Sequence, residues 1–206
     1  MVLLREFYSK AGLSGKMQKL LLHCCCAPCA SYVLEYLSEQ FETTAFFFNP
    51  NIIPKDEHDK RAEELCKLME LAKYPNSSGV TICGYEPDVF SSVAESYSDE
   101  PEGGRRCGEC FRLRLSKTAA EANAGGYDFF ATTLTVSPHK NVGLINEIGN
   151  GIAEQCSAAY LISDFKKKGG FQRSIELSKQ YGLYRQSYCG CFPSVRDAAA
   201  RRRNSS

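Results

Sequence analysis

Short apolar runs alternate with longer amphipathic segments along most of this 206-residue chain. Each run has the length of a buried strand. The predicted strands are Lys19–Cys24, Thr43–Asn49, Gly79–Gly84, Tyr127–Thr133 and Ala158–Ser163. Strands that alternate with helices predict an α/β fold with a doubly wound, mostly parallel sheet.

The segments between the strands carry helical spacing of their apolar residues. The predicted helices are Ser31–Gln40, Lys55–Lys73, Asp88–Ser96, Cys107–Ala124, Asn141–Glu154 and Phe171–Tyr181. The C-terminal part is predicted to contain the helix Phe171–Tyr181 and, from CGCFPS onwards, an irregular segment. We expect an N-terminal extension over residues 1–17, one domain over 18–193 and a basic, disordered tail over 194–206.

Eleven cysteines are the unusual feature of the composition. Charges at Arg5, Glu6, Lys10 and Lys16 interrupt any apolar core of a secretory signal, and no stretch approaches the about 18 apolar residues of a membrane helix. We therefore expect a cytoplasmic protein without a membrane partner. Clustered cysteines in a reducing compartment indicate metal binding or redox chemistry rather than a disulfide scaffold.

The cysteines form three groups: Cys24, Cys25, Cys26 and Cys29, then Cys107 and Cys110, then Cys189 and Cys191. The C-x-x-C that opens a predicted helix, beside Arg105 and Arg106, favours anionic sulfur. Two such groups brought together offer tetrahedral sulfur ligation, which suits either zinc or an iron–sulfur cluster. The isolated Cys66, Cys83 and Cys156 are interpreted as core residues.

Cys189 and Cys191 are separated by one glycine. A disulfide between them closes a strained ring, and strained disulfides are labile or catalytic rather than structural. This favours a redox-active pair, with two free thiols or additional metal ligands as the alternative.

Several unusual motifs occur in an order that resembles the cobalamin-independent epoxyqueuosine reductases, QueH. They are LLHCCCAPCAS, FFFNPNIIPKDEH, GGRRCGECFRLRL, FATTLTVSPHKN and DFKKKGGFQRSIELSKQYGLYRQSYCGC, and they run from about Leu20 to Pro193. The resemblance implies a fold like that of the adenine nucleotide alpha-hydrolases (HUP). It also implies an oxidoreductase that reduces the epoxide of epoxyqueuosine at the tRNA wobble position to queuosine, without cobalamin.

The same resemblance implies a set of site residues. A 4Fe-4S cluster would be held by Cys25, Cys26, Cys107 and Cys110, and Cys189 and Cys191 would be the redox-active pair. Cys29 would bind a possible additional iron ion. Because Cys24 precedes the Cys25–Cys26 pair, a second register of ligands stays open.

Opening an epoxide to an alkene consumes two electrons and two protons, so the site needs an acid. The candidates are Glu57, His58 and His139, while His23 is interpreted as a supporting or core residue. The pairs Gly103–Gly104 and Gly169–Gly170 are too short for a phosphate-binding loop. This argues against an ATP-dependent thiolase or a sulfonucleotide reductase on the same fold.

The net charge is only +1, so nucleic-acid affinity must come from a local patch. The predicted tRNA-binding residues are Lys166, Lys167, Lys168, Arg173 and Arg185, with Tyr181, Tyr184, Tyr188 and Phe192 among them and a basic run at Arg201–Arg203. Basic side chains for phosphates and aromatic rings for unstacked bases suit an anticodon loop. The alternative is a zinc-stabilised, non-catalytic RNA-binding module. An electron donor is required, but the sequence does not identify it.

Overall fold

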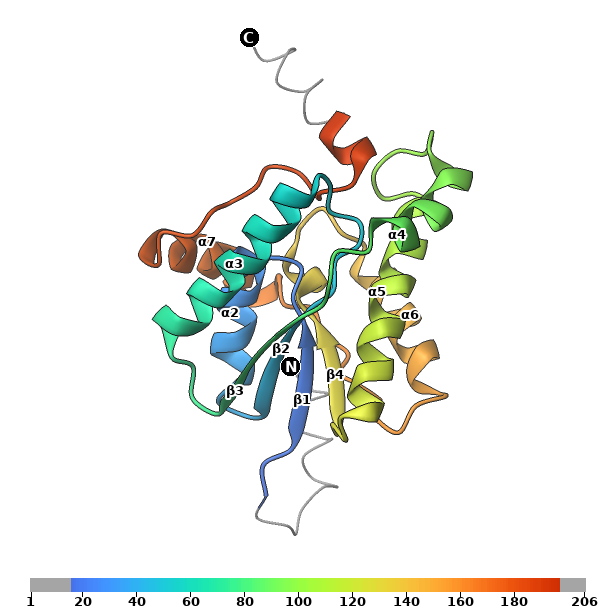
Figure 1. Cartoon of the computed structure of the whole chain (residues 1–206). Helices are drawn as coiled ribbons and strands as arrows, with labels where there is room; N and C mark the ends of the chain where they lie inside the picture. The colour runs from blue at the N-terminus through green and yellow to red at the C-terminus, as the bar shows by residue number, and fades with distance from the viewer. Residues whose placement is uncertain (1–15, 197–206) are drawn as a thin grey trace.

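The computed structural model describes residues 16–196 and contains one five-stranded sheet (Figure 1). The strands are β1 (Lys19–His23), β2 (Glu42–Phe47), β3 (Ser77–Ile82), β4 (Phe129–Thr132) and β5 (Ala159–Tyr160). Every neighbouring pair is parallel, and the order across the sheet is β3-β2-β1-β4-β5. The predicted doubly wound α/β fold is confirmed.

Helices cover both faces of the sheet. They are α2 (Ala27–Leu37), α3 (Lys55–Ala72), α4 (Pro87–Ala94), α5 (Arg105–Ala124), α6 (Val142–Ala153) and α7 (Gly170–Gln180), with short 3-10 turns at Glu95–Tyr97, Thr133–Val136 and Lys167–Gly169. In Figure 1, α2, α3 and α7 lie on one side of the sheet, and α5 and α6 lie on the other.

The alternation of side chains along β1 explains the two layers. Leu20 and Leu22 are fully buried in the core beneath α2 and α3, whereas Leu21 points into a second core with α5 and α6. Successive side chains of a strand point to opposite faces, so a strand covered on both faces is apolar throughout. This is why KLLLH reads as a continuous apolar run rather than an alternating one.

Most element boundaries agree with the sequence within two residues, and three parts of the chain differ from the prediction. Helix α2 begins at Ala27, four residues before the predicted start, because Pro28 is compatible with the first helical turn. Strand β5 has only two residues, and both are paired with β4. Residues 192–196 are helical and Ser194 is buried, where the sequence predicted an irregular end.

The predicted N-terminal extension and basic tail, including Arg201–Arg203, lie almost entirely outside the described residues. No helix within residues 16–196 combines the length and the hydrophobicity that crossing a membrane requires.

The strand order places a switch point between β1 and β4, because the chain runs outward from β1 to β3 and later continues on the other side with β4 and β5. Ligands of open α/β sheets bind at the carboxyl ends of strands at such a point. The segments that follow β1 and β4 therefore define where to look for a site.

Candidate active site

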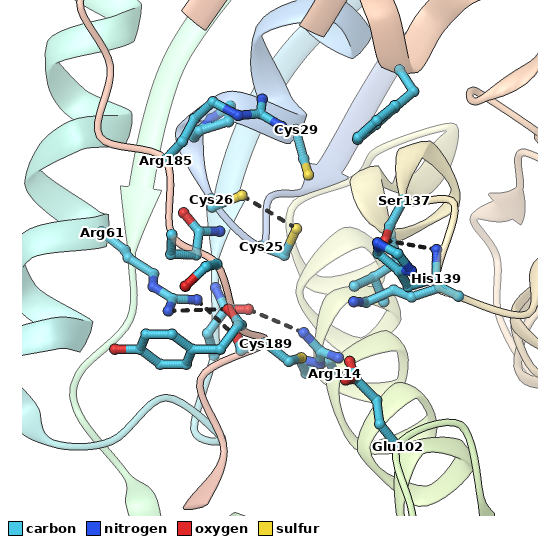
Figure 2. Close-up of a pocket in the computed structure, with 18 residues that line it drawn as sticks. Cys25, Cys26, Cys29, Arg61, Glu102, Arg114, Ser137, His139, Arg185 and Cys189 are labelled. Carbon is cyan, nitrogen blue, oxygen red and sulfur yellow. Dashed lines mark hydrogen bonds between the residues drawn. The ribbon is translucent and has the colours of Figure 1, made fainter. Parts of the chain in front are cut away.

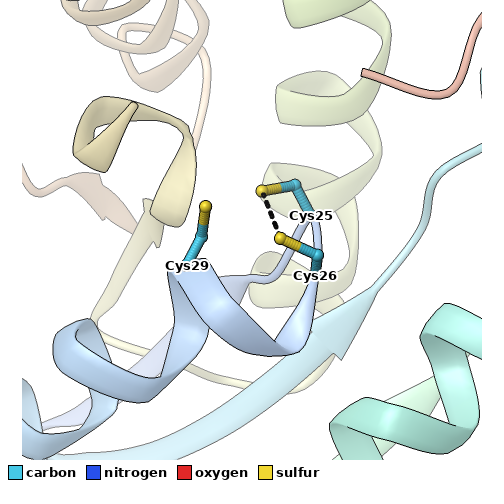
Figure 3. A group of neighbouring side chains, drawn as sticks. All are labelled: Cys25, Cys26 and Cys29. Carbon is cyan, nitrogen blue, oxygen red and sulfur yellow. Dashed lines mark hydrogen bonds between the residues drawn. The ribbon is translucent and has the colours of Figure 1, made fainter. Parts of the chain in front are cut away.

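Cys24, Cys25 and Cys26 follow β1 directly, and α2 begins at the next residue. The Sγ atoms of Cys25, Cys26 and Cys29 lie within 4.8 Å of one another, and Figure 3 shows the three side chains converging at the start of α2. Cys24 is fully buried, and its thiol donates to the carbonyl oxygen of Leu22 at 3.4 Å. The structure therefore separates Cys24 from the other three thiols.

Among Cys25, Cys26 and Cys29, the surroundings of Cys25 stabilise a negatively charged sulfur most strongly. Its Sγ lies 3.8 Å from that of Cys26 and accepts a hydrogen bond from Thr133 Oγ1 at 3.4 Å. Hydrogen bonds from Cys26 and then Cys29 hold the pKa of Cys25 well below its usual range, and the Lys140 ammonium group contributes further. The group thus supplies one readily ionised sulfur and two neighbouring thiols, a donor set suited to a thiophilic metal.

These three thiols line a cavity of about 470 Å³ at the carboxyl end of the sheet. Figure 2 shows them on one wall, with Arg61 and Cys189 on a second and Ser137 and His139 on a third. Cavities of this size accept a small ligand or a single nucleobase.

A second, narrower cavity of about 20 Å³ adjoins the first, and four more thiols line it: Cys107, Cys110, Cys189 and Cys191. Cys107 and Cys110 project from the first turn of α5, where the backbone N–H of Gly103 donates to Cys107 Sγ at 3.2 Å. Burial raises the pKa of Cys110 to about 12, although the nearby Arg114 opposes this. The two cavities share Glu102, Arg114, His139, Lys140 and Cys189 in their walls.

The predicted ligands therefore fall into two neighbouring groups. Cys25 and Cys26 lie with Cys29 at the first cavity, and Cys107 and Cys110 lie with the Cys189–Cys191 pair at the second. All eleven cysteines of the chain are free thiols. Cys189, which lines both cavities, connects the two groups.

Contacts from distant parts of the chain fix the Cys189–Cys191 segment. Arg61 Nη1 donates to the carbonyl oxygen of Cys189 at 2.8 Å, and the N–H of Ile53 donates to the carbonyl oxygen of Gly190 at 3.0 Å. The N–H of Gly190 in turn donates to Ser194 Oγ at 3.0 Å. Gly190 has a φ of +123°, a conformation that residues with a side chain rarely adopt.

Of the three acids predicted from the sequence, only His139 lines the cavities. His58 packs between the rings of Phe47 and Tyr85 and bonds to Asp59 at 3.2 Å. Glu57 forms an ion pair with Arg61 at 2.7 Å. Glu57 and His58 thus have structural partners, and neither residue lines the two cavities.

His23 is a core residue, as the sequence indicated. It is fully buried at the end of β1, where Nδ1 lies 2.9 Å from Thr132 Oγ1 and Nε2 lies 3.2 Å from the carbonyl oxygen of Phe48. Burial lowers its pKa to about 4, so the ring is neutral at neutral pH and joins the ends of β1, β4 and β2.

Arg114 and Lys140 are site residues that the sequence reasoning missed, although both occur in quoted motifs. The Cys189 and Cys25 sulfurs raise the pKa of Lys140, with burial opposing them. Arg114 is 1% exposed on α5, one turn after Cys110. The sequence did contain a signal for Arg114, namely its i, i+4 spacing from Cys110. This spacing places Arg114 on the same face of the helix as the cysteine.

The predicted tRNA-binding residues have different surroundings. Arg185 lines the first cavity, and its guanidinium lies 5.8 Å from the ring centre of Phe171, which lines the same cavity. Arg173 forms a two-pronged ion pair with Glu35 at 2.7 and 3.0 Å. Lys167 lies 3.5 Å from Asp164, and Lys166, Lys167 and Lys168 follow β5 on the loop before α7.

The fold and the site define a class: a doubly wound α/β protein whose sheet switch point is lined by clustered free thiols. The family model for "Epoxyqueuosine reductase QueH" matches residues 20–197. The chain belongs to the QueH family and is an oxidoreductase.

Several relatives carry the name epoxyqueuosine reductase QueH. The protein of Staphylococcus epidermidis is 41% identical over 194 residues, which cover 91% of this chain and 81% of the relative. That of Streptococcus pyogenes is 44% identical over 174 residues, covering 84% and 68%. That of Thermotoga maritima is 36% identical over 182 residues, covering 87% and 91%. The family resemblance inferred from the motifs is confirmed, and the alternative of a non-catalytic module is not supported.

Proposed function

We propose that this enzyme reduces the epoxide of epoxyqueuosine in tRNA to the alkene of queuosine, using an iron–sulfur centre and a dithiol. The observation that carries the proposal is the arrangement of seven thiols around two adjoining cavities in a chain of this family. A large site lined by redox-capable sulfur suits a reductive step better than hydrolysis or group transfer.

The residues present fit an iron–sulfur centre. The donor set is made of thiols from separate elements, and buried cationic side chains accompany it, as an anionic cluster requires. Cys25, Cys26, Cys107 and Cys110 are the proposed ligands of a 4Fe-4S cluster. Cys29, within 4.8 Å of the first two, is the proposed ligand of an additional iron ion. When bound, such a centre transfers single electrons and offers iron as a Lewis acid.

The Cys189–Cys191 dithiol is the proposed source of the reducing equivalents. Conversion of an epoxide to an alkene releases its oxygen as water and consumes two electrons and two protons. Oxidation of two thiols to one disulfide supplies both, so the reaction balances without another co-reactant. A separate electron donor must then reduce the disulfide before the next turnover.

The proton for the leaving oxygen is expected to come from the shared wall of the cavities. His139 and Lys140 both lie there, whereas Glu57 and His58 do not. A proton donor must be within hydrogen-bond reach of the atom that it protonates. His139 is therefore kept as a candidate acid, and Lys140 joins it.

The substrate is proposed to enter the first cavity as an unstacked nucleotide of the anticodon loop. Phe171 offers an aromatic ring at the cavity wall, and Arg185 offers a cation beside it. Lys166, Lys167 and Lys168 are proposed to contact the phosphates.

The deciding experiment is an anaerobic assay with tRNA that contains epoxyqueuosine, with digested nucleosides read by mass spectrometry. The expected product is lighter by one oxygen, and neither Cys189→Ser nor Cys191→Ser is expected to form it, because a single thiol of the pair cannot supply two electrons by forming the disulfide. A protein that carries only zinc after purification under anaerobic, iron-replete conditions contradicts the proposal. So does a protein that leaves the epoxide unchanged in the presence of a strong chemical reductant.

A further inference from the structure

Arg114 is one of two arginines at the site, with Arg106, that are only 1% exposed. Its guanidinium lines both cavities, and Figure 2 shows it on the same side as Cys189. Two of its nitrogens are occupied: Nε donates to the carbonyl oxygen of Cys110 at 3.2 Å, and Nη1 donates to Asn49 Oδ1 at 3.4 Å. Both contacts hold the plane of the guanidinium in place.

The third nitrogen, Nη2, is buried without an acceptor among residues 16–196. Leaving a charged donor unpaired in the interior is unfavourable, so such a group indicates a missing partner. Glu102 lines the same two cavities, but its carboxylate makes no hydrogen bond to Nη2. The free N–H therefore remains available to a group that enters the site.

Two further buried side chains at the second cavity share this property. Asn51 is 1% exposed, and neither atom of its amide group has a partner within the described part of the chain. Arg106 is equally buried, and its Nε and Nη2 also lack acceptors there. Unpaired donors thus gather around the cavity that Cys107, Cys110, Cys189 and Cys191 line.

The residues that line the second cavity indicate which kind of acceptor these unpaired N–H groups would bind. The second cavity, at about 20 Å³, is too small for a phosphate ester or a base. Sulfur is the acceptor already present in its walls, on Cys107, Cys110, Cys189 and Cys191.

We propose that Arg114 is a positioning residue that donates its Nη2–H to sulfur of the iron–sulfur centre and raises the centre's reduction potential. This inference rests on the proposed function. Reduction adds negative charge to the centre, and a nearby cation with a hydrogen bond stabilises the reduced form more than the oxidised form. Removing Arg114 therefore makes the centre harder to reduce.

The test measures the midpoint potential of the reconstituted, full-length protein by spectroelectrochemical titration without oxygen. Arg114→Gln is expected to disfavour reduction at least tenfold, a shift of about 59 mV to more negative potential for one electron, with iron content unchanged. Arg114→Lys keeps the charge but loses the planar fork, so a smaller negative shift is expected. Arg112→Gln, on the same helix with a side chain 55% exposed, is the matched control and leaves the potential unchanged.

The possible outcomes separate the two proposals. A wild-type protein that acquires no cluster contradicts the proposed function itself. A loaded Arg114→Gln protein with the wild-type potential overturns only the inference on Arg114. Where Arg114→Gln does not fold or load, the Arg114→Lys protein decides, and a wild-type potential in that variant overturns the inference.

Discussion

The guanidinium of Arg61 donates a hydrogen bond to the carbonyl oxygen of Cys189 at 2.8 Å across 128 residues of sequence. Arg61 lies on α3, and its ion pair with Glu57 at 2.7 Å belongs to the same helix. One buried cation thus connects the helix after β2 to the segment that carries the proposed dithiol. This contact explains why Arg61 is 2% exposed although it is charged.

Replacing Arg61 should destabilise the protein as well as the dithiol segment. Arg61→Gln leaves the Glu57 carboxylate, 11% exposed, without its cation, and an unpaired buried charge costs about 3–5 kcal/mol. The free energy of unfolding, measured by urea denaturation, should fall toward the low end of that range because Tyr184 still bonds to Glu57. The double variant Glu57→Gln/Arg61→Gln should recover part of the loss, and strictly additive effects would contradict the coupling.

Gly190 should not tolerate a side chain. A Cβ there would lie 2.9 Å from Ile52 Cγ1 and 3.3 Å from Arg61 Nη1, in addition to the strain of its positive φ. Gly190→Ala is expected to lower the thermal midpoint, because the Cys189–Cys191 segment must move to make room for the methyl group. The same movement is expected to displace the two thiols and to slow their oxidation to a disulfide. Gly79→Ala is the matched control, because Gly79 also has a positive φ of +103° but has open space around it. Backbone strain alone costs about 1–3 kcal/mol and is present in both variants. If Gly190→Ala lowers the thermal midpoint no more than Gly79→Ala does, the steric clash at Gly190 is excluded.

The three consecutive cysteines should differ in their effect on metal content. Cys24 is fully buried with its thiol bonded to Leu22, whereas Cys25 and Cys26 line the first cavity. Iron per protein, measured after anaerobic reconstitution, should fall sharply in Cys25→Ala and Cys26→Ala and remain close to wild type in Cys24→Ala. Loss of iron in Cys24→Ala, with retention in Cys26→Ala, would show that the ligands use the other register.

The order of elements was predictable from the sequence because their apolar periods are strong. KLLLH and FFF give continuous apolar runs, as expected for strands covered on both faces. The partnership of Cys25, Cys26 and Cys29 is also local, since all three lie within one turn of the start of α2. Nothing in the local pattern, however, states which strands are neighbours, so the pairing of β1 with β4 required the structure.

The charged part of the site was less predictable. Arg61, Arg106 and Arg114 are each 1–2% exposed, yet in sequence they occupy helices that look like ordinary charged surface helices. Burial of an arginine depends on the tertiary partner that accepts its hydrogen bonds, and those partners lie 65 and 128 residues away for Arg114 and Arg61. Conversely, Arg173 was predicted to bind tRNA but already has Glu35 as a partner.

Arg173 is paired with Glu35, whereas Arg185 lines the first cavity. We therefore predict that replacing them has different effects on the salt dependence of tRNA binding. Arg185→Gln should reduce the slope of log affinity against log salt concentration by about 0.7, the value for one phosphate contact on single-stranded nucleic acid. Arg173→Gln should change the slope little, because Glu35 and Glu176 already neutralise Arg173. Binding of the anticodon stem-loop, measured by fluorescence anisotropy at several salt concentrations, tests both. Equal slopes for the two variants would contradict the assignment.

The separation of the thiols along the chain has a consequence for how the enzyme is made. Cys25, Cys26 and Cys29 come together as soon as β1 and α2 have formed, but the second cavity needs α5 and the segment around Cys189 and Cys191. A chain emerging from the ribosome therefore exposes three reactive thiols while most of the protein is still to be synthesised. Assembly of the proposed iron–sulfur centre would have to wait for the last of these segments, and until then the first thiols would be open to oxygen and to unsuitable metals.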